Sequence, residues 1–150
     1  MRELSANLSR LIDGAEPILR SVGDAESSKP LLAGGWSRKE LIGHLIDSAS
    51  NNHQRFVRAA LQRALDFPGY DQDASVRVQR FQEVDWNLLV SLWVAYNRHL
   101  AHVIAQLPAG HLETPCRIGY GNTVALRFLA TDYVDHLVHH LRQLGVAEPA

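Results

Sequence analysis

The sequence predicts an all-α fold, a four-helix bundle in a single domain spanning residues 1–150. In four segments of about twenty residues, apolar side chains recur every three or four positions, as on the buried face of an amphipathic helix. Almost no segment alternates between apolar and polar residues as a half-buried strand does. With 46% hydrophobic and 21% charged residues, the composition is that of a globular protein able to bury a core.

The first helix is expected from Glu3 to Val22. Its apolar residues fall at helical spacing: Leu4, Leu8, Leu11, Ile12, Ala15, Ile18 and Leu19. Pro17 lies inside this segment and lacks a backbone N–H, so we expect a break or kink between Gly14 and Glu16. A loop rich in Gly, Ser and Pro follows, over residues 23–35.

The second helix has the clearest start in the chain. Ser37 and Glu40 have the spacing of a capping box, in which each side chain accepts a hydrogen bond from an amide that the helix leaves free. Apolar positions carry this helix to about Leu65, and turn residues 66–71 end it. Residues 73–83 fit either a short helix or a helical extension.

A broad apolar stripe predicts the third helix. It runs from Asp85 to about Leu107, and Pro108 and Gly110 stop it. A loop over residues 109–121 leads from there to the last helix.

The fourth helix is expected to start at Asn122 or Thr123, because either residue could serve as its N-cap. It runs to about Leu144, where Gly145 ends it. Four such helices joined by two long connections indicate a bundle. Bundle cores commonly hold metal sites built from side chains on facing helices.

Charge, cysteine content and hydropathy exclude several classes of function. The formal net charge is −1 and no basic stripe stands out, so we expect no nucleic-acid partner. Cys116 is the only cysteine, which excludes an internal disulfide and a cysteine-based zinc site; we expect it to be a packing residue in a loop. No signal-peptide core and no apolar run of about 18 residues is present, so we expect a cytoplasmic protein without membrane contact.

His136 and His140 are the most informative residues of the chain. Four residues of helix turn through about 400°, so both rings lie on one face, one turn apart. Two neutral imidazoles at this spacing can bind one metal ion. The best third ligand is His44 on the second helix. The zinc-protease pattern HExxH is absent because Leu137 occupies its acidic position.

Polar stripes border the apolar faces of the second and fourth helices. The stripes contain His44, Asp47, Ser48 and Asn51 on the second helix, and His136, His139, His140 and Gln143 on the fourth. A buried polar group without a partner costs about 1–3 kcal/mol. A metal ion would satisfy several of these groups, and a hydrogen-bonded network would do so too. The candidates to contact the ligands or face a substrate are Asp47, Asn51, His139 and Gln143.

The remaining histidines fit a metal site less well. His53 lies nine residues after His44, about 180° around the helix, and is expected to face solvent. His99 and His102 form a rival pair three residues apart on the third helix. We expect His102 to face water, whereas His99 could line the same cavity as Tyr96 and contact the metal ligands.

Three stretches of the sequence carry a family resemblance. They are Trp36–Glu40 leading to Gly43–Asp47, Tyr96–Pro108, and His136–Gln143. In this order and spacing they resemble the DinB-like family (DNA-damage-inducible B, also called YfiT-like). The resemblance implies an up-down-down-up bundle, a homodimer, and one divalent metal ion, zinc or nickel, held by His44, His136 and His140.

One position departs from the family pattern. The family often has an acidic residue directly after the first histidine of the closing motif, and this chain has Leu137. Asp132, Asp135 or Gln143 could substitute for that residue near the ligands.

The ligand set and the resemblance together indicate an enzyme. Three neutral imidazoles leave a coordination position open, as in catalytic rather than structural zinc sites. Such an ion can activate water or a thiol at neutral pH. We expect hydrolysis of, or thiol transfer to, a small substrate, and the family's use of mycothiol and bacillithiol makes a low-molecular-weight thiol a candidate partner. The alternative is a non-catalytic, stress-related helical dimer or ligand-binding module with a structural or vestigial metal site.

Overall fold

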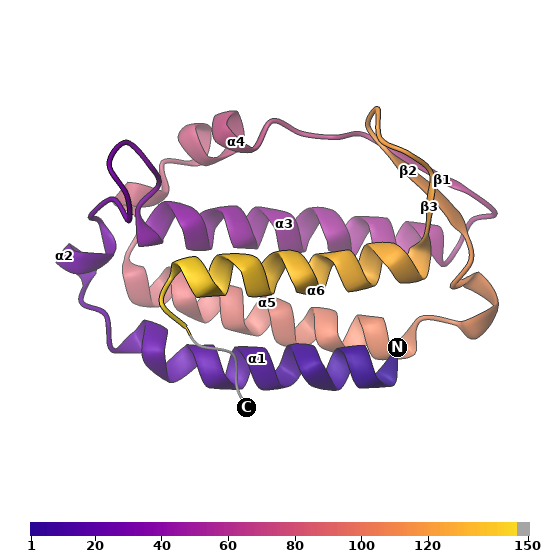
Figure 1. The fold of residues 1–150 in the computed structure, drawn as a ribbon, viewed down its shortest axis with the longest axis horizontal. Coiled ribbons are helices and arrows are strands. Elements are labelled where there is room, and N and C mark those ends of the chain that lie inside the picture. Colours follow the sequence, from indigo (N-terminus) through magenta and orange to yellow (C-terminus); the bar gives the residue numbers. More distant parts are fainter. Residues whose placement is uncertain (147–150) are drawn as a thin grey trace.

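The computed structural model describes residues 1–146 and confirms the predicted four-helix bundle (Figure 1). Four long helices form the bundle: α1 (Arg2–Arg20), α3 (Arg38–Ala59), α5 (Trp86–Gln106) and α6 (Leu126–Gln143). Short elements occupy the connections between them: α2 (Asp24–Ser27), α4 (Gln72–Gln79), and the 3₁₀ turns η1 (Phe81–Glu83) and η2 (Ala109–His111).

The direction of the helices follows an up-down-down-up order. In Figure 1, α1 and α6 run one way along the bundle while α3 and α5 run the other way. Helix α5 packs against both α1 and α3, and α6 packs against both α3 and α1. The consequence for function is that α3 and α6 are antiparallel neighbours, so the start of one helix faces the end of the other.

Large side chains fill the core between the helices. Trp86, Trp93, Tyr133 and Phe56 are all at most 2% exposed. The indole N–H of Trp86 donates to the carbonyl of Leu19, 2.9 Å away, so α5 and α1 are joined by a hydrogen bond as well as by apolar contact. Burial of this kind contributes about 25 cal/mol per Å² of apolar surface, which makes these contacts the main source of stability.

The second helix begins as predicted and ends earlier than predicted. The Ser37 hydroxyl accepts from the Glu40 amide at 3.2 Å, and the Glu40 carboxylate accepts from the Ser37 amide at 2.9 Å, which completes the capping box. Helix α3 stops at Ala59 rather than near Leu65. The reason is that residues 65–67 form a strand that pairs with residues 116–118.

A small three-stranded sheet at the end of the bundle was not predicted from the sequence (Figure 1). Strand β1 (Leu65–Phe67) runs parallel to β2 (Pro115–Ile118), and β2 is antiparallel to β3 (Val124–Ala125). Cys116 pairs with Leu65 and is fully buried, so it is a packing residue as predicted, but in a strand and not in a loop.

Pairing within this sheet also moves the start of the last helix. Ala125 is the N-cap of α6, so neither Asn122 nor Thr123 caps it. Strands of two to four residues are too short to show an alternating pattern, which is why the sequence did not reveal them.

Helix α1 shows no break at Pro17. It is continuous from Arg2 to Arg20. Buried residues lie on both sides of the proline, among them Ile12 and Leu19, so packing against the bundle holds the helix together where one backbone hydrogen bond is missing.

Helix α4 resolves the ambiguous segment 73–83 as a helix followed by a 3₁₀ turn. Asp71 caps α4 through a hydrogen bond from the amide of Ala74 at 3.0 Å. Within residues 1–146, no helix combines the length and the apolar character needed to cross a bilayer.

Candidate metal centre

Three histidine side chains converge between α3 and α6. The Nε2 atoms of His44 and His136 are 3.2 Å apart, and those of His136 and His140 are 3.1 Å apart. One ring nitrogen from each residue lies within 4.8 Å of the other two. His136 and His140 meet because they lie one turn apart on α6, and His44 reaches them because the start of α3 faces the end of α6.

The spacing of these nitrogens fits a single metal ion. Zinc-bound imidazole nitrogens lie about 2.0–2.1 Å from the ion, so two at tetrahedral positions are about 3.3 Å apart. The separations of 3.1 and 3.2 Å are close to that value. Within residues 1–146, His44, His136 and His140 form the one group of three or more potential ligands whose donor atoms come together. The donor set, three imidazoles with no carboxylate or thiolate, suits a transition-metal ion such as zinc, nickel, copper or iron.

Burial keeps the three rings neutral and therefore able to bind a cation. His44 is fully buried, and His136 and His140 are half-buried. Burial, reinforced by the neighbouring histidines, lowers the pKa of His44 and of His136 to about 4. Burial also lowers the pKa of His140. At neutral pH each ring therefore has a nitrogen lone pair free for a ligand bond.

Gln143 determines which nitrogen of His140 carries the proton. The Oε1 atom of Gln143 lies 2.8 Å from Nδ1 of His140, so a neutral His140 donates its Nδ1–H there and keeps the lone pair on Nε2. The amide nitrogen of Gln143 lies 3.2 Å from Nε2 of His139, which is exposed. Both residues predicted from the polar stripe of α6 therefore lie beside a candidate ligand.

His44 is held differently, by packing instead of a hydrogen bond. Its ring lies 5.0 Å from the ring of Trp36. Its Nδ1 atom is buried and has no hydrogen-bond partner among residues 1–146. The orientation of this ring therefore depends on the indole beside it.

Asp47 and Asn51 do not reach the histidines. The Asp47 carboxylate accepts from the Ser75 hydroxyl at 2.7 Å and from the Gln79 amide at 2.7 and 2.9 Å. Asn51 donates to the backbone carbonyl of Asp47 at 3.0 Å. Asp47 thus fastens α4 onto α3. The polar stripe of α3 therefore contains a candidate metal ligand, His44, and a residue that anchors a neighbouring helix, Asp47.

His99 also lies away from the three histidines. It is exposed on α5, and its ring centroid is 5.0 Å from that of His53. His53 is half-buried, and its Nδ1 atom lies 3.2 Å from the Tyr96 hydroxyl, which corrects the expectation that it faces solvent. The ring of His53 meets α5 because α3 and α5 pack along their length.

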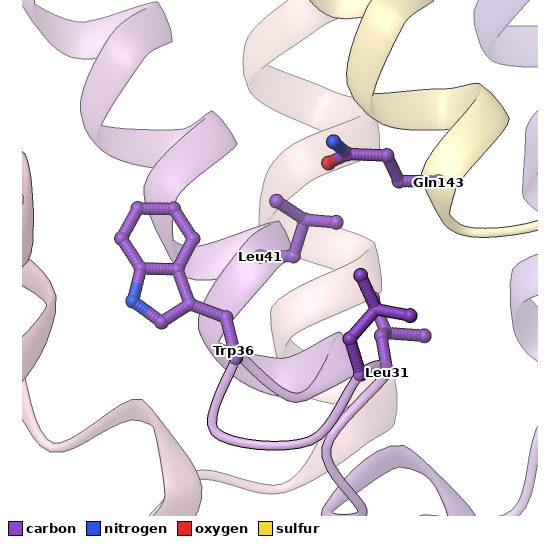
Figure 2. A pocket seen from close by; sticks show the side chains of 6 residues that line it. Leu31, Trp36, Leu41 and Gln143 are labelled. Carbon is purple, nitrogen blue, oxygen red and sulfur yellow. The ribbon is translucent and has the colours of Figure 1, made fainter.

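An apolar pocket of about 320 Å³ opens beside the candidate ligands (Figure 2). In Figure 2, Leu41 lies between Trp36 and Leu31 at the start of α3, and the side chain of Gln143 extends from the end of α6 above them. Because Trp36 contacts His44 and Gln143 contacts His140, this pocket borders two of the three histidines.

A second, polar pocket of about 240 Å³ borders the third histidine. Its lining includes Asn52, Arg55, Tyr70, Asp132, Tyr133 and His136. The sequence analysis missed Arg55 and Tyr70 as site residues. A signal for Arg55 was present, since it lies eleven residues after His44, about three full turns of helix along the same face. Tyr70 had none, because a turn between helices brings it over the pocket.

Comparison with known sequences supports the family assignment. The model of the DinB superfamily matches residues 7–144. A protein of Bacillus pumilus (strain SAFR-032), provisionally named a metal-dependent hydrolase, is 26% identical over 134 residues, covering 86% of this chain and 74% of the relative.

Two solved structures share the fold. One is YfiT from Bacillus subtilis, described as a probable metal-dependent hydrolase with an unusual four-helix bundle topology. It matches with a TM-score of 0.84 at 18% identity, over 95% of this chain and 82% of YfiT. The other, a mycothiol-dependent maleylpyruvate isomerase, matches with a TM-score of 0.78 at 17% identity, over 98% of this chain and 62% of the isomerase. Because the family model spans nearly all of the sequence, the chain belongs to the DinB superfamily.

Proposed function

We propose that this protein is a metal-dependent hydrolase in which His44, His136 and His140 bind one divalent ion, zinc or nickel. The observation that carries the proposal is the convergence of three neutral imidazole nitrogens at separations of 3.1 and 3.2 Å. Their number leaves room in the coordination sphere for a reactant. The Bacillus pumilus relative, provisionally named a metal-dependent hydrolase, favours water as that reactant.

The chemistry supplied by such an ion is a lowered pKa of coordinated water, to about 7 in the best-known cases. The protein contributes the rest. Gln143 holds His140 in the tautomer that directs Nε2 towards the other two rings. Asp132 is the carboxylate that lines the pocket beside His136, and we assign to it the role of proton acceptor. The apolar pocket at Trp36 can hold a hydrophobic part of the substrate.

Thiol transfer is the second candidate. It is favoured by the fold shared with a mycothiol-dependent isomerase and by the same open set of three imidazoles, to which a thiolate can bind. In this case the partner is a low-molecular-weight thiol such as mycothiol or bacillithiol. The homodimer expected from the family resemblance stays a prediction.

The test begins with metal content and continues with two reactions. Untagged protein is loaded with zinc or nickel, and hydrolysis of p-nitrophenyl acetate is compared with transfer of mycothiol to monochlorobimane. We expect one ion per chain, hydrolysis that a chelator abolishes, and loss of both in His136→Gln. His102→Gln, which removes an exposed histidine of α5, is the matched control. Full metal content in His136→Gln would overturn the ligand assignment, and metal-dependent thiol transfer without hydrolysis would select the second candidate.

Asp132→Asn separates metal binding from proton transfer. A general base typically accelerates a reaction by about 10²–10⁴-fold, so we expect kcat for the hydrolysed probe to fall about 100-fold. The zinc affinity should stay within about twofold of wild type, because Asp132 is not among the converging donors. Unchanged kcat would remove Asp132 from the mechanism and leave the metal site standing.

A further inference from the structure

The polar pocket beside His136 contains a cation, Arg55, that has no anionic partner within 4 Å among residues 1–146. Arg55 is half-buried on α3 and lines this pocket. Its Nη1 donates to the Asn52 side-chain oxygen at 3.3 Å, and its guanidinium carbon lies 5.6 Å from the centre of the Phe67 ring. Its Nε atom is buried and has no hydrogen-bond partner within residues 1–146.

Other cations of the molecule that are removed from water are paired with carboxylates. Lys39, 3% exposed, lies 2.9 Å from Asp24. Arg38, half-buried at the start of α3, lies 3.7 Å from Glu26. Removing a cation from water is costly unless an anion compensates. Among the described residues Arg55 makes no ion pair within 4 Å, even though Asp132 lines the same pocket, so an anion from outside would complete its environment.

A second donor faces the same pocket. Burial, reinforced by Asp47, raises the pKa of the Tyr70 hydroxyl, so this group remains protonated at neutral pH and able to donate a hydrogen bond. Burial lowers the pKa of Arg55, opposed by Tyr70 and Asp132, yet a guanidinium stays charged at any physiological pH. The pocket therefore offers a planar cation and a hydroxyl donor beside His136.

We propose that this pocket binds the carboxylate of a small molecule, with Arg55 as the residue that selects it. A guanidinium matches a carboxylate geometrically and forms charge-assisted hydrogen bonds with it. A monoanion fits better than a dianionic phosphate, because the carboxylate of Asp132 lies in the same pocket of about 240 Å³. That the bound molecule is a substrate rests on the proposed function, whereas the carboxylate site does not.

The test measures binding of three probes that share a propyl chain to ¹⁵N-labelled protein: butyrate, butyramide and propylphosphonate. The reporter is the Nε–H signal of Arg55, identified by its absence in Arg55→Gln. Metal-free and zinc-loaded protein are both titrated. Arg58→Gln is the matched control, since it removes the same charge one turn further along α3 from an exposed side chain. Circular dichroism of both variants confirms that they fold.

Butyrate is expected to shift the Arg55 signal saturably in both metal states and to bind at least tenfold more tightly than the other two probes. Arg55→Gln should lose at least tenfold in butyrate affinity, and Arg58→Gln less than twofold. Equal binding of butyramide, tighter binding of propylphosphonate, or butyrate binding unaffected by Arg55→Gln would each overturn the proposal. If Arg55→Gln does not fold, the relative affinities of the three probes for the wild-type protein still test the proposal. A protein that binds butyrate through Arg55 but no zinc would contradict the proposed function alone.

Discussion

The two halves of helix α3 carry one histidine each and differ in what surrounds it. In the first half, every residue from 41 to 49 is buried, under α6 on one side and under α4 and η1 on another. In the second half, residues 50–59, the buried positions are Asn52, Phe56 and Ala59. His44 belongs to the first half and His53 to the second.

The rings of these two histidines have similar histidine neighbours. The ring centroids of His44 and His140 are 5.0 Å apart, and those of His53 and His99 are also 5.0 Å apart. The difference lies in the third partner. His136 completes a set of three nitrogens around His44, whereas the partner of His53 is the hydroxyl of Tyr96. Contact between two histidines therefore does not distinguish the two halves of α3, whereas convergence of a third ring nitrogen does.

Replacing the histidine of each half in turn should give the largest difference between the two halves of α3. In His44→Gln, zinc affinity is expected to fall at least about 100-fold, because loss of groups that merely support ligands already costs about 10–100-fold. In His53→Gln, it should stay within about twofold. Competition with a chromophoric zinc chelator, on untagged protein, measures both. An affinity within tenfold of wild type in His44→Gln, or an equal loss in the two variants, would remove the distinction between the halves.

The close packing of η1 on the first half of α3 can be tested by adding a single methyl group. A Cβ added at Gly43 would lie 2.2 Å from the buried ring of Phe81 in η1. Gly→Ala inside a helix normally stabilises by about 0.5–1 kcal/mol, but overpacking costs about 1–3 kcal/mol. We expect Gly43→Ala to lower the free energy of unfolding by about 1–2 kcal/mol in urea titrations. A stabilised variant would show that η1 can move away from α3 at little cost.

The four helices could be predicted from the sequence because their signals are local. The Ser37–Glu40 capping box and the apolar repeats depend only on residues within one or two turns. The sheet could not, because its strands are too short to show an alternating pattern, and β1 is defined by its pairing with the distant residues Cys116–Ile118. The predicted break near Pro17 was wrong for a related reason, because packing against other helices outweighs one missing backbone hydrogen bond.

The site could be predicted only where a helical period contains it. His136 and His140 share a face by spacing alone, and Gln143 follows from the same period. Asp47 has the same spacing from His44 as a site residue would have, yet it points to Ser75 and Gln79, whose position depends on how α4 packs on α3. Helical spacing specifies a face of the helix, and tertiary packing decides what covers that face.

The hydrogen-bond partners of the two regions offer a finer test. Gln143→Ala removes the acceptor that fixes the tautomer of His140, and we expect zinc affinity to fall about tenfold, at the lower end of the usual effect of such groups. Tyr96→Phe removes the hydroxyl beside His53 and should leave zinc affinity unchanged. Isothermal titration of metal-free protein with zinc measures both. Equal affinities in the two variants would mean that the tautomer of His140 is fixed without Gln143.

The smallest expected difference concerns pH. Without metal, the folded-state pKa of His44 is about 4, against about 6.5 for an unperturbed imidazole. Between these values the unfolded chain binds a proton at this residue that the folded protein does not. The contribution of His44 to the free energy of unfolding is therefore fully present above about pH 7 and is lost as the pH drops from 6.5 to 4. The pKa of half-buried His53 is lowered in the same direction, and less desolvation should make its contribution smaller.

The variants of the first prediction measure this contribution. The pH dependence of urea unfolding near pH 5 reports the number of protons taken up on unfolding. For metal-free His44→Gln this uptake should be about one proton below that of wild type. For His53→Gln the decrease should be less than half of that. Equal decreases would indicate that the two halves of α3 desolvate their histidines to the same extent, and the comparison would then rest on the number of converging nitrogens alone.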